Sequence, residues 1–172
     1  AGELLDIYLD AVGANASLLL NIPPDTHGRI AAPDCASLTE LGTKIQQIFA
    51  SNVTEKAAIT TDSAIAQHPI TQAVDGMANT YWQAAYGQES DTITLNFPKP
   101  QKVSCVVLGE HLPTGQRIES GEIWADGSKA SEFTVVGHKR ICRFAPVEVQ
   151  TLTIKITASR TEPTLRLLEV YQ

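Results

Sequence analysis

The sequence predicts a mainly β protein, in which an antiparallel β-sandwich follows a short helix–strand–helix segment of an α/β fold. Two patterns of apolar residues lead to this prediction. Up to about residue 52 they recur at helical spacing or form one continuous run, whereas beyond it they alternate with polar residues. About eight short strands, separated by Gly, Pro or Asp turns and without a long helix between them, are typical of a sandwich.

The first unit, residues 1–52, is expected to contain two helices with one strand between them. The first helix has apolar residues at helical spacing before Gly13, namely Leu4, Leu5, Tyr8, Leu9 and Val12. Residues 16–22 form a short apolar run, which favours a strand covered on both faces, as in a parallel sheet. Ser37 and Glu40 have the spacing of a capping box, so the second helix is expected over residues 37–50.

The second unit, residues 53–172, is expected to be the β-sandwich. Alternating apolar residues predict strands at residues 92–97, 103–108, 118–125, 133–136, 141–144, 151–157 and 165–171. Turns with Gly, Pro or Asp separate several of these runs, as at residues 98–100, 113–115 and 126–127.

The composition limits the kinds of partner that the chain could have. With 172 residues, of which 43% are hydrophobic, the chain is able to bury a core. Its formal net charge of −6 argues against a nucleic-acid partner, and no apolar run reaches the ~20 residues that span a bilayer. Cys35, Cys105 and Cys142 form no CxxC or Cys/His pattern, so neither a zinc site nor a redox motif is expected, and their disulfide state is left open.

The first unit resembles part of a catalytic barrel. Residues 16–22 need neighbouring strands that the unit does not supply, which indicates the tail of a larger α/β domain. The stretch YLDAVGANASLLLNIPPDTHGRI at residues 8–30 resembles the end of the barrel of family 29 α-L-fucosidases. Further matching residues are Asp34, Leu38, Leu41, Gly42 and Ile45. The resemblance implies that residues 16–22 are the last strand of a (β/α)8-type barrel and residues 37–50 its closing helix.

The second unit resembles a discoidin, or coagulation-factor type C, domain of the kind grouped with family 32 carbohydrate-binding modules. The matching residues lie at 73–76, 80–82, 92–97, 108–117, 137–141 and 168–171. Bacterial fucosidases of family 29 often carry such a domain directly after the barrel, so the order of the two units supports both resemblances. The implied fold is a jelly roll like that of galactose-binding domains, in which the position of Trp82 usually lies in the core.

The resemblance implies a parent protein that is a retaining glycosidase, releases terminal L-fucose and is located in the periplasm or outside the cell. Such enzymes use two carboxyl groups roughly 5 Å apart, and the resemblance implies no cofactor for catalysis. None of the carboxylates in this chain lies in a matching motif, because the catalytic ones belong to sequence upstream, so we expect this chain alone to be inactive. The implied partners are fucosylated or galactose-type glycans and the remainder of the catalytic barrel.

Asn21 is the residue for which the resemblance implies a place near the active site. It ends the predicted barrel strand, and active sites of such barrels lie at the C-terminal ends of the strands. Its amide would lie at the rim of the site and orient a catalytic side chain or a bound sugar. The alternative is a structural role, in which Asn21 ends the strand before Pro23 and Pro24, which lack N–H donors.

Asp75, Thr80 and Glu169 resemble the structural calcium site of discoidin-type modules. Calcium prefers hard oxygen ligands, which here would be two carboxylates, a hydroxyl and backbone carbonyls near Gln72 and Ala78. Gly76 allows the sharp turn that directs such carbonyls inward. The alternative is an Asx turn that holds no ion.

Six residues in the sandwich are candidates for contact with a sugar or with the barrel: Tyr86, Glu110, His111, Arg117, Lys139 and Arg140. A galactose-type site needs charged groups beside an aromatic ring, and an interface between domains needs charged groups as well. The sandwich is therefore expected to support the barrel or to bind sugar. The alternative function is a free-standing carbohydrate-binding module that recognises galactose-type glycans without catalysis.

Overall fold

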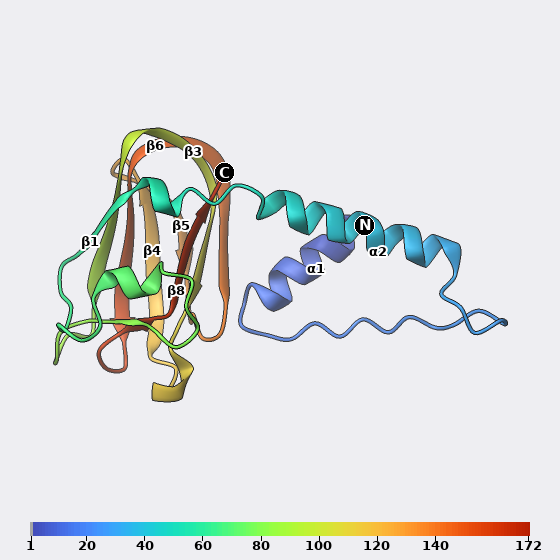
Figure 1. Ribbon diagram of the computed structural model, residues 1–172, viewed down its shortest axis with the longest axis horizontal. Helices are drawn as coiled ribbons and strands as arrows, with labels where there is room; N and C mark the ends of the chain where they lie inside the picture. The colour runs from blue at the N-terminus through green and yellow to red at the C-terminus, as the bar shows by residue number, and fades with distance from the viewer. Residues whose placement is uncertain (1) are drawn as a thin grey trace.

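The computed structural model describes residues 2–172, in which two helices lie to one side of a β-sandwich (Figure 1). The helices are α1 (Gly2–Val12) and α2 (Ala32–Ile48). The strands are β1 (Ala58–Thr61), β2 (Trp82–Gln83), β3 (Asp91–Gly109), β4 (Ile118–Ala125), β5 (Ser128–Phe133), β6 (Arg140–Ser159), β7 (Thr164–Leu165) and β8 (Leu167–Tyr171). Short 3-10 turns are present at η1 (Thr54–Lys56), η2 (Ile70–Ala73) and η3 (Leu112–Thr114). No described helix combines the length and apolarity that a membrane crossing needs.

The paired strands are antiparallel throughout. One sheet of six strands has the order β1-β3-β6-β4-β5, with β8 also paired to β3, and β2 pairs separately with β7. The predicted fold class, mainly β with antiparallel sheets and two preceding helices, is confirmed.

β3 and β6 are long, bent strands that connect the two halves of the sandwich. Residues 93–96 of β3 pair with β1, whereas residues 105–109 pair with β8. Between these parts the register against β6 shifts around Pro98 and Pro100, both of which are exposed. The sequence predicts two strands here, at 92–97 and 103–108. Because the prolines lie at the register shift, the strand bends there without ending.

The core of the sandwich follows the alternation in the sequence. Ile93, Leu95 and Phe97 of β3 are buried, and so are Leu152, Ile154 and Ile156 of β6. Trp82 is fully buried among them, and its Nε1 donates a hydrogen bond to the backbone oxygen of Ser63 over 3.1 Å. The expectation that Trp82 lies in the core is confirmed.

A second apolar cluster joins the helices to the sandwich. Leu9 of α1 packs with residues of β3, β6 and β8, namely Cys105, Val107, Ile141 and Tyr171. Phe49, which follows α2, meets Tyr171 edge to face with ring centroids 5.2 Å apart. The two units are therefore held together by buried side chains as well as by the connecting chain.

The segment between the helices differs from the sequence prediction. Residues 16–22 form no strand, because no neighbouring strand is present among the described residues to pair with them. Figure 1 shows this segment running along the helices to the end distant from the sandwich. Leu19, in the middle of the run, is 92% exposed.

α2 also begins earlier than the sequence predicts, and the capping box is not formed. The helix extends over Ala32–Ile48 in place of residues 37–50, and Ala31 precedes it without a side-chain cap. Pro33 lies in the first turn, where its missing N–H costs no helical hydrogen bond. Ser37 and Glu40 therefore lie within the helix, where the N–H groups already have partners. The three cysteines are all free thiols.

Candidate functional site

Asn21 lies on the unpaired segment between the two helices. Its side chain is exposed, and no hydrogen bond to it is present in the described structure. Within this chain Asn21 therefore caps no strand, and its sequence-based place at the rim of an active site stays a prediction.

Asn15 of the first unit contacts the sandwich at Gly137, in the turn that leads to Lys139 and Arg140. Asn15 Oδ1 accepts a hydrogen bond from the His138 N–H over 2.6 Å, and the Asn15 N–H donates to the Lys139 oxygen over 3.0 Å. The backbone of Arg140 pairs with that of Ala14 in an isolated antiparallel β-bridge. Lys139 also places its Nζ 5.3 Å from the ring centroid of Phe49. Lys139 and Arg140 thus lie between the two units of this chain.

Glu110, for which the sequence predicts a contact with a sugar or with the barrel, makes its hydrogen bonds within the sandwich. Its side chain is fully buried. Oε1 accepts hydrogen bonds from the N–H groups of Arg117 (2.7 Å) and Ile118 (2.9 Å), and Oε2 accepts one from Gly137 (2.6 Å). The carboxylate therefore joins the start of β4 to the turn before β6, and it is not exposed at the surface of this chain.

His111 belongs to a stack of three aromatic rings. The Tyr81 ring lies between His68 and His111, with centroid separations of 3.9 Å and 3.8 Å and interplanar angles of 20° and 9°. The stack connects the loop before η2, the residue that precedes β2 and the second residue after β3. Burial, with help from the charges of His68, Arg117 and Arg166, holds the pKa of His111 below its usual value.

Arg117 and Glu162 fasten the loop that carries Tyr86. Arg117 donates from its guanidinium to the Glu162 backbone oxygen over 2.7 Å, and Glu162 Oε1 accepts the Gly87 N–H over 2.8 Å. The Gly87 N–H, with the Thr161 hydroxyl, lowers the pKa of Glu162 to about 2. Tyr86 is 76% exposed, so its ring is free to contact a ligand or another protein surface.

Asp75 and Glu169 line one small cavity of about 170 Å³, together with Glu55 and Asn52. Asp75 accepts the Thr80 hydroxyl with both oxygens, at 2.9 and 2.8 Å, and its Oδ1 also accepts the Met77 N–H over 2.8 Å. Glu169 accepts the Tyr171 hydroxyl over 2.9 Å. The donor set has the hard oxygens that calcium prefers. However, no three His, Cys, Asp or Glu side chains converge on a metal position among residues 2–172.

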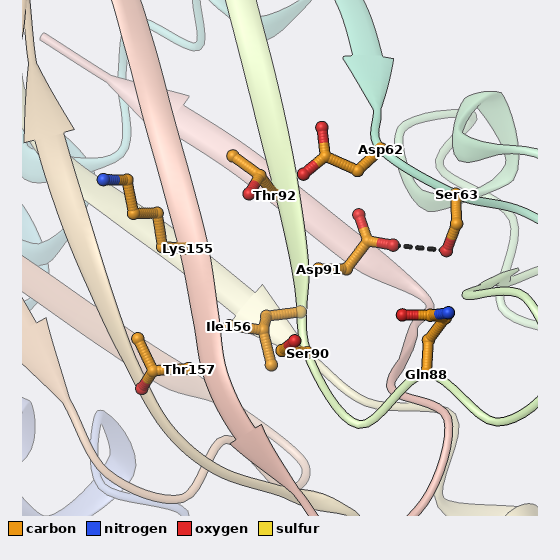
Figure 2. Close-up of a pocket in the computed structure, with 9 residues that line it drawn as sticks. All are labelled: Asp62, Ser63, Gln88, Ser90, Asp91, Thr92, Lys155, Ile156 and Thr157. Atoms are coloured by element: carbon orange, nitrogen blue, oxygen red, sulfur yellow. Dashed lines mark hydrogen bonds between the residues drawn. The ribbon is translucent and has the colours of Figure 1, made fainter.

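A hollow of about 490 Å³ lies where β1 ends, β3 begins and β6 passes (Figure 2). Its lining is polar and includes Asp62, Ser63, Gln88, Ser90, Asp91 and Lys155. Asp91 is only 6% exposed, and its Oδ2 accepts the Ser63 hydroxyl over 2.5 Å. The other oxygen, Oδ1, is buried and has no hydrogen-bond partner. Figure 2 shows this oxygen turned toward the Asp62 side chain.

The environment of Asp91 disfavours a negative charge. Burial raises the pKa of Asp91, and the nearby Asp62 carboxylate adds to the rise. The Ser63 hydrogen bond and the backbone N–H groups of Asp62 and Thr92 act in the opposite direction. Ser63 is itself fixed, because its hydroxyl also accepts the Ala85 N–H over 3.0 Å. Sequence reasoning did not single out Asp91. A signal was present, however, since Asp91 precedes Ile93 by two residues and so shares the inward face of the strand.

Comparison with known proteins links the chain to fucosidases. Alpha-L-fucosidase 1 of Arabidopsis thaliana is 29% identical over 182 residues, which cover 99% of this chain and 36% of that protein. A GH29 fucosidase of Ruminococcus gnavus, solved in complex with fucose, matches with a TM-score of 0.90 and 27% identity. That match covers 99% of this chain and 36% of the fucosidase. The resemblance to family 29 fucosidases is thereby confirmed, and the chain spans little more than a third of these relatives.

The sandwich also has a structural relative that is smaller. Chitosan-binding module 2 from a chitosanase/glucanase of Paenibacillus, solved with chitotriose, matches with a TM-score of 0.62 and 24% identity. The match covers 70% of this chain and all of the module, so the two share a fold. A search of protein-family models finds none that matches this chain. The discoidin-like relationship of the second unit stays a prediction.

Proposed function

We propose that this chain is the C-terminal part of an α-L-fucosidase, in which it completes the catalytic barrel and carries an accessory sandwich. One observation carries the proposal. Both units match the Ruminococcus gnavus fucosidase together, over 99% of the chain and at a TM-score of 0.90. The two helices and the sandwich thus have the same arrangement as in that fucosidase. The whole protein would release terminal L-fucose and act in the periplasm or outside the cell.

The exposed segment at residues 16–22 supports this proposal. An unpaired run with Leu19 almost fully exposed is unfavourable in water, and burial between neighbouring strands would remove that cost. As the last barrel strand, this run would place Asn21 at the catalytic rim, since active sites lie at the C-terminal ends of barrel strands. The catalytic carboxylates would come from the preceding part of the protein.

The sandwich would act first as a support for the barrel. Hydrogen bonds of Asn15 and the cluster around Leu9 fix it to the first unit, so it is not attached by a flexible linker alone. Residues that face outward, such as Tyr86, would then contact the barrel or a glycan. The second unit would be a discoidin-like domain, with fucosylated or galactose-type glycans as its ligands.

The test compares this chain with the longer protein that includes the preceding coding sequence. We expect the longer protein to release nitrophenol from nitrophenyl α-L-fucoside and the short chain to release none. In the longer protein, Leu19→Asp should lower the melting temperature and the activity, because it would place a charge between barrel strands. Hydrolysis by the short chain, or an inactive longer protein that folds correctly, would contradict the proposal.

The alternative, a free-standing carbohydrate-binding module, predicts a different outcome. A module of that kind would bind galactose-type glycans as the short chain, and the longer protein would add no hydrolytic activity. Fluorescence titration of the short chain with galactose and fucose, alongside the nitrophenyl assay, separates the two functions.

A structural calcium ion at Asp75 and Glu169 is a second part of this proposal. The two carboxylates line the same cavity, Thr80 adjoins Asp75, and no Lys or Arg lines that cavity among the described residues. Calcium would neutralise the charges and stabilise the loop. We expect calcium to raise the melting temperature and a chelator to reverse the rise, with Asp75→Asn abolishing both effects. An unchanged midpoint would count against the ion.

A further inference from the structure

Two asparagines of the chain lie in the acceptor motif for N-linked glycans, Asn-x-Ser/Thr. They are Asn15, which Ser17 follows, and Asn52, which Thr54 follows. The motif does not separate the two positions, because the middle residue is not proline in either of them. Their surroundings in the folded chain differ, and this difference decides which position is able to carry a glycan.

Asn15 has no room for a sugar on its side-chain nitrogen. Its Nδ2 lies where a β-carbon on Gly137 would be, and it donates a hydrogen bond to Gln116 Oε1 over 3.4 Å. Its Oδ1 accepts the His138 N–H, so the whole amide is held against the sandwich. A glycan on Nδ2 would overlap the backbone at Gly137 and separate the first unit from the sandwich.

Asn52 has a side-chain nitrogen without a partner among the described residues. It lies in the connection between α2 and β1, and it is exposed. Its Oδ1 accepts the Thr54 N–H over 2.9 Å, which fixes the orientation of the amide, and no described residue accepts a hydrogen bond from Nδ2. Asn52 also borders the small cavity of Asp75 and Glu169. Because Asn52 is exposed, a sugar on Nδ2 is able to extend into solvent and breaks no hydrogen bond of the folded chain.

Thr54 indicates when the modification has to take place. It is 2% exposed, and its hydroxyl accepts the Val170 N–H over 2.7 Å. The Val53 N–H donates in turn to the Val170 oxygen, so this part of the motif is paired with β8. The motif requires the Thr54 hydroxyl, which the folded chain conceals. Transfer of a glycan therefore has to precede folding, and the fold then has to accommodate the glycan.

We propose that Asn52 carries an N-linked oligosaccharide in the secreted protein and that Asn15 carries none. This rests on the proposed function only for the location outside the cell. In the transfer, Asn52 Nδ2 forms a bond to the anomeric carbon of an oligosaccharide that is supplied as a lipid diphosphate. The bond between that carbon and the diphosphate oxygen breaks, the lipid diphosphate leaves with the electron pair, and the nitrogen loses one proton. The glycan would lie where residues 51–54 line β8, and it would prevent another chain from pairing at this edge of the sheet.

The test is secretion of the 172-residue chain, behind a signal peptide, from a eukaryotic cell line. A glycosidase that converts each glycosylated asparagine to aspartate marks the modified position for mass spectrometry. Trypsin separates the two motifs, because Arg29 ends the peptide with Asn15 and Lys56 ends the peptide with Asn52. We expect the mark at Asn52 and an unmodified Asn15 in the secreted chain. The chain retained in the cells is analysed in the same way, so a low yield of secreted protein still gives a result for Asn52.

Two variants and one peptide connect the result to the structure. Asn52→Gln should abolish the glycan, and its mass is readable whether or not the variant folds. Ser17→Ala is the matched control, because it removes the first motif but keeps the Asn15 amide, and it should leave the glycan in place. A peptide of residues 45–56 should accept an oligosaccharide from a microsomal transferase. The folded chain, made without a glycan, should not accept one, because Thr54 is buried.

Three results would overturn the proposal. They are an unmodified Asn52 in both the secreted and the retained chain, a glycan on Asn15 in the secreted chain, and modification of the folded chain as readily as of the peptide. The fucoside assay measures hydrolysis by the longer protein and does not depend on any of these results, so either proposal is able to fail alone.

Discussion

The side-chain amide of Asn15 occupies the space that a β-carbon on Gly137 would need. Both residues have left-handed backbones, with φ of 68° at Asn15 and 58° at Gly137. The contact lets the Asn15 amide reach the His138 N–H, so the first unit is joined to the sandwich by a fitted contact between two turns. A glycine is required at position 137 both for its backbone and for its missing side chain.

Gly137→Ala should therefore destabilise the chain by about 2 kcal/mol or more, since it combines left-handed strain with an overlap against Asn15. Gly127→Ala is the control, because Gly127 has φ of +80° but open space around it, and should cost only about 1 kcal/mol. Urea unfolding measures both. Equal losses of unfolding free energy in the two variants would mean that the overlap with Asn15 adds nothing to the cost at position 137.

Glu110→Gln should lower the free energy of unfolding by about 2–4 kcal/mol. The substituted amide keeps one acceptor, but its NH₂ group would face a backbone N–H that Glu110 now satisfies. Glu148→Gln, on an exposed position of β6, is the matched control and should change stability little. Urea unfolding measures both variants. A small loss of unfolding free energy in Glu110→Gln would contradict a stabilising role for the Glu110 hydrogen bonds.

His111 should make the chain less stable as the pH falls below about 6.5. Its pKa is lowered in the folded state, so the unfolded chain takes up the proton more readily and unfolding is favoured on acidification. His68, Arg117 and Arg166 are the charged groups that act on it. His111→Gln should weaken the loss of stability between about pH 7.5 and pH 5.5, whereas His27→Gln, on an exposed turn, should not. An identical pH profile in wild type and His111→Gln would contradict this.

Glu162 should stabilise the chain at neutral pH and lose this effect in acid. Its folded pKa of about 2 lies below the usual 4.5, so the contribution is complete above about pH 4.5 and declines as the pH falls toward 2. Glu162→Gln should thus be less stable than the wild type at pH 6, with a difference that narrows at about pH 3. Glu89→Gln, at an exposed position of the neighbouring loop that carries Gly87, should show no such convergence.

Leu19→Ser should change the stability of this chain by less than about 0.5 kcal/mol, because the side chain is 92% exposed. Leu9→Ala is the contrast, since Leu9 is 6% exposed and packs between α1 and the sheet, and it should cost about 2–5 kcal/mol. Thermal unfolding of both variants tests the difference. A large loss in Leu19→Ser would show that the segment is packed in solution.

Local patterns sufficed for much of the sandwich. Alternation around Ile93 and Ile154 reports which face of a strand is buried, and this information lies within a few residues of sequence. The continuity of β3 through Pro98 depends on pairing with β6, about fifty residues further along the chain, and so has no local signal. The start of α2 was missed because Ser37 and Glu40 have the spacing of a cap, while the helix depends on Pro33 for its first turn.

The candidate sites were harder to predict from the sequence for the same reason, because their contacts join residues far apart in the chain. Glu110 follows an apolar run, which is compatible with burial, but its partner Gly137 lies 27 residues away. Nothing near Glu110 in the sequence distinguishes a buried carboxylate that binds backbone N–H groups from a carboxylate at the surface. Asp91 is the reverse case, since its place two residues before Ile93 predicts an inward side chain, and an inward carboxylate needs an explanation.

The bend shared by β3 and β6 has a consequence for how the chain loses its structure. Because the same two strands run through both halves of the sandwich, neither half is able to open without breaking hydrogen bonds in the other. Amide hydrogens beside Ile93 and beside Val107 should therefore exchange with solvent at the same slow rate, through one common opening of the whole sandwich. The helices, joined through side chains around Leu9, should exchange faster and separately.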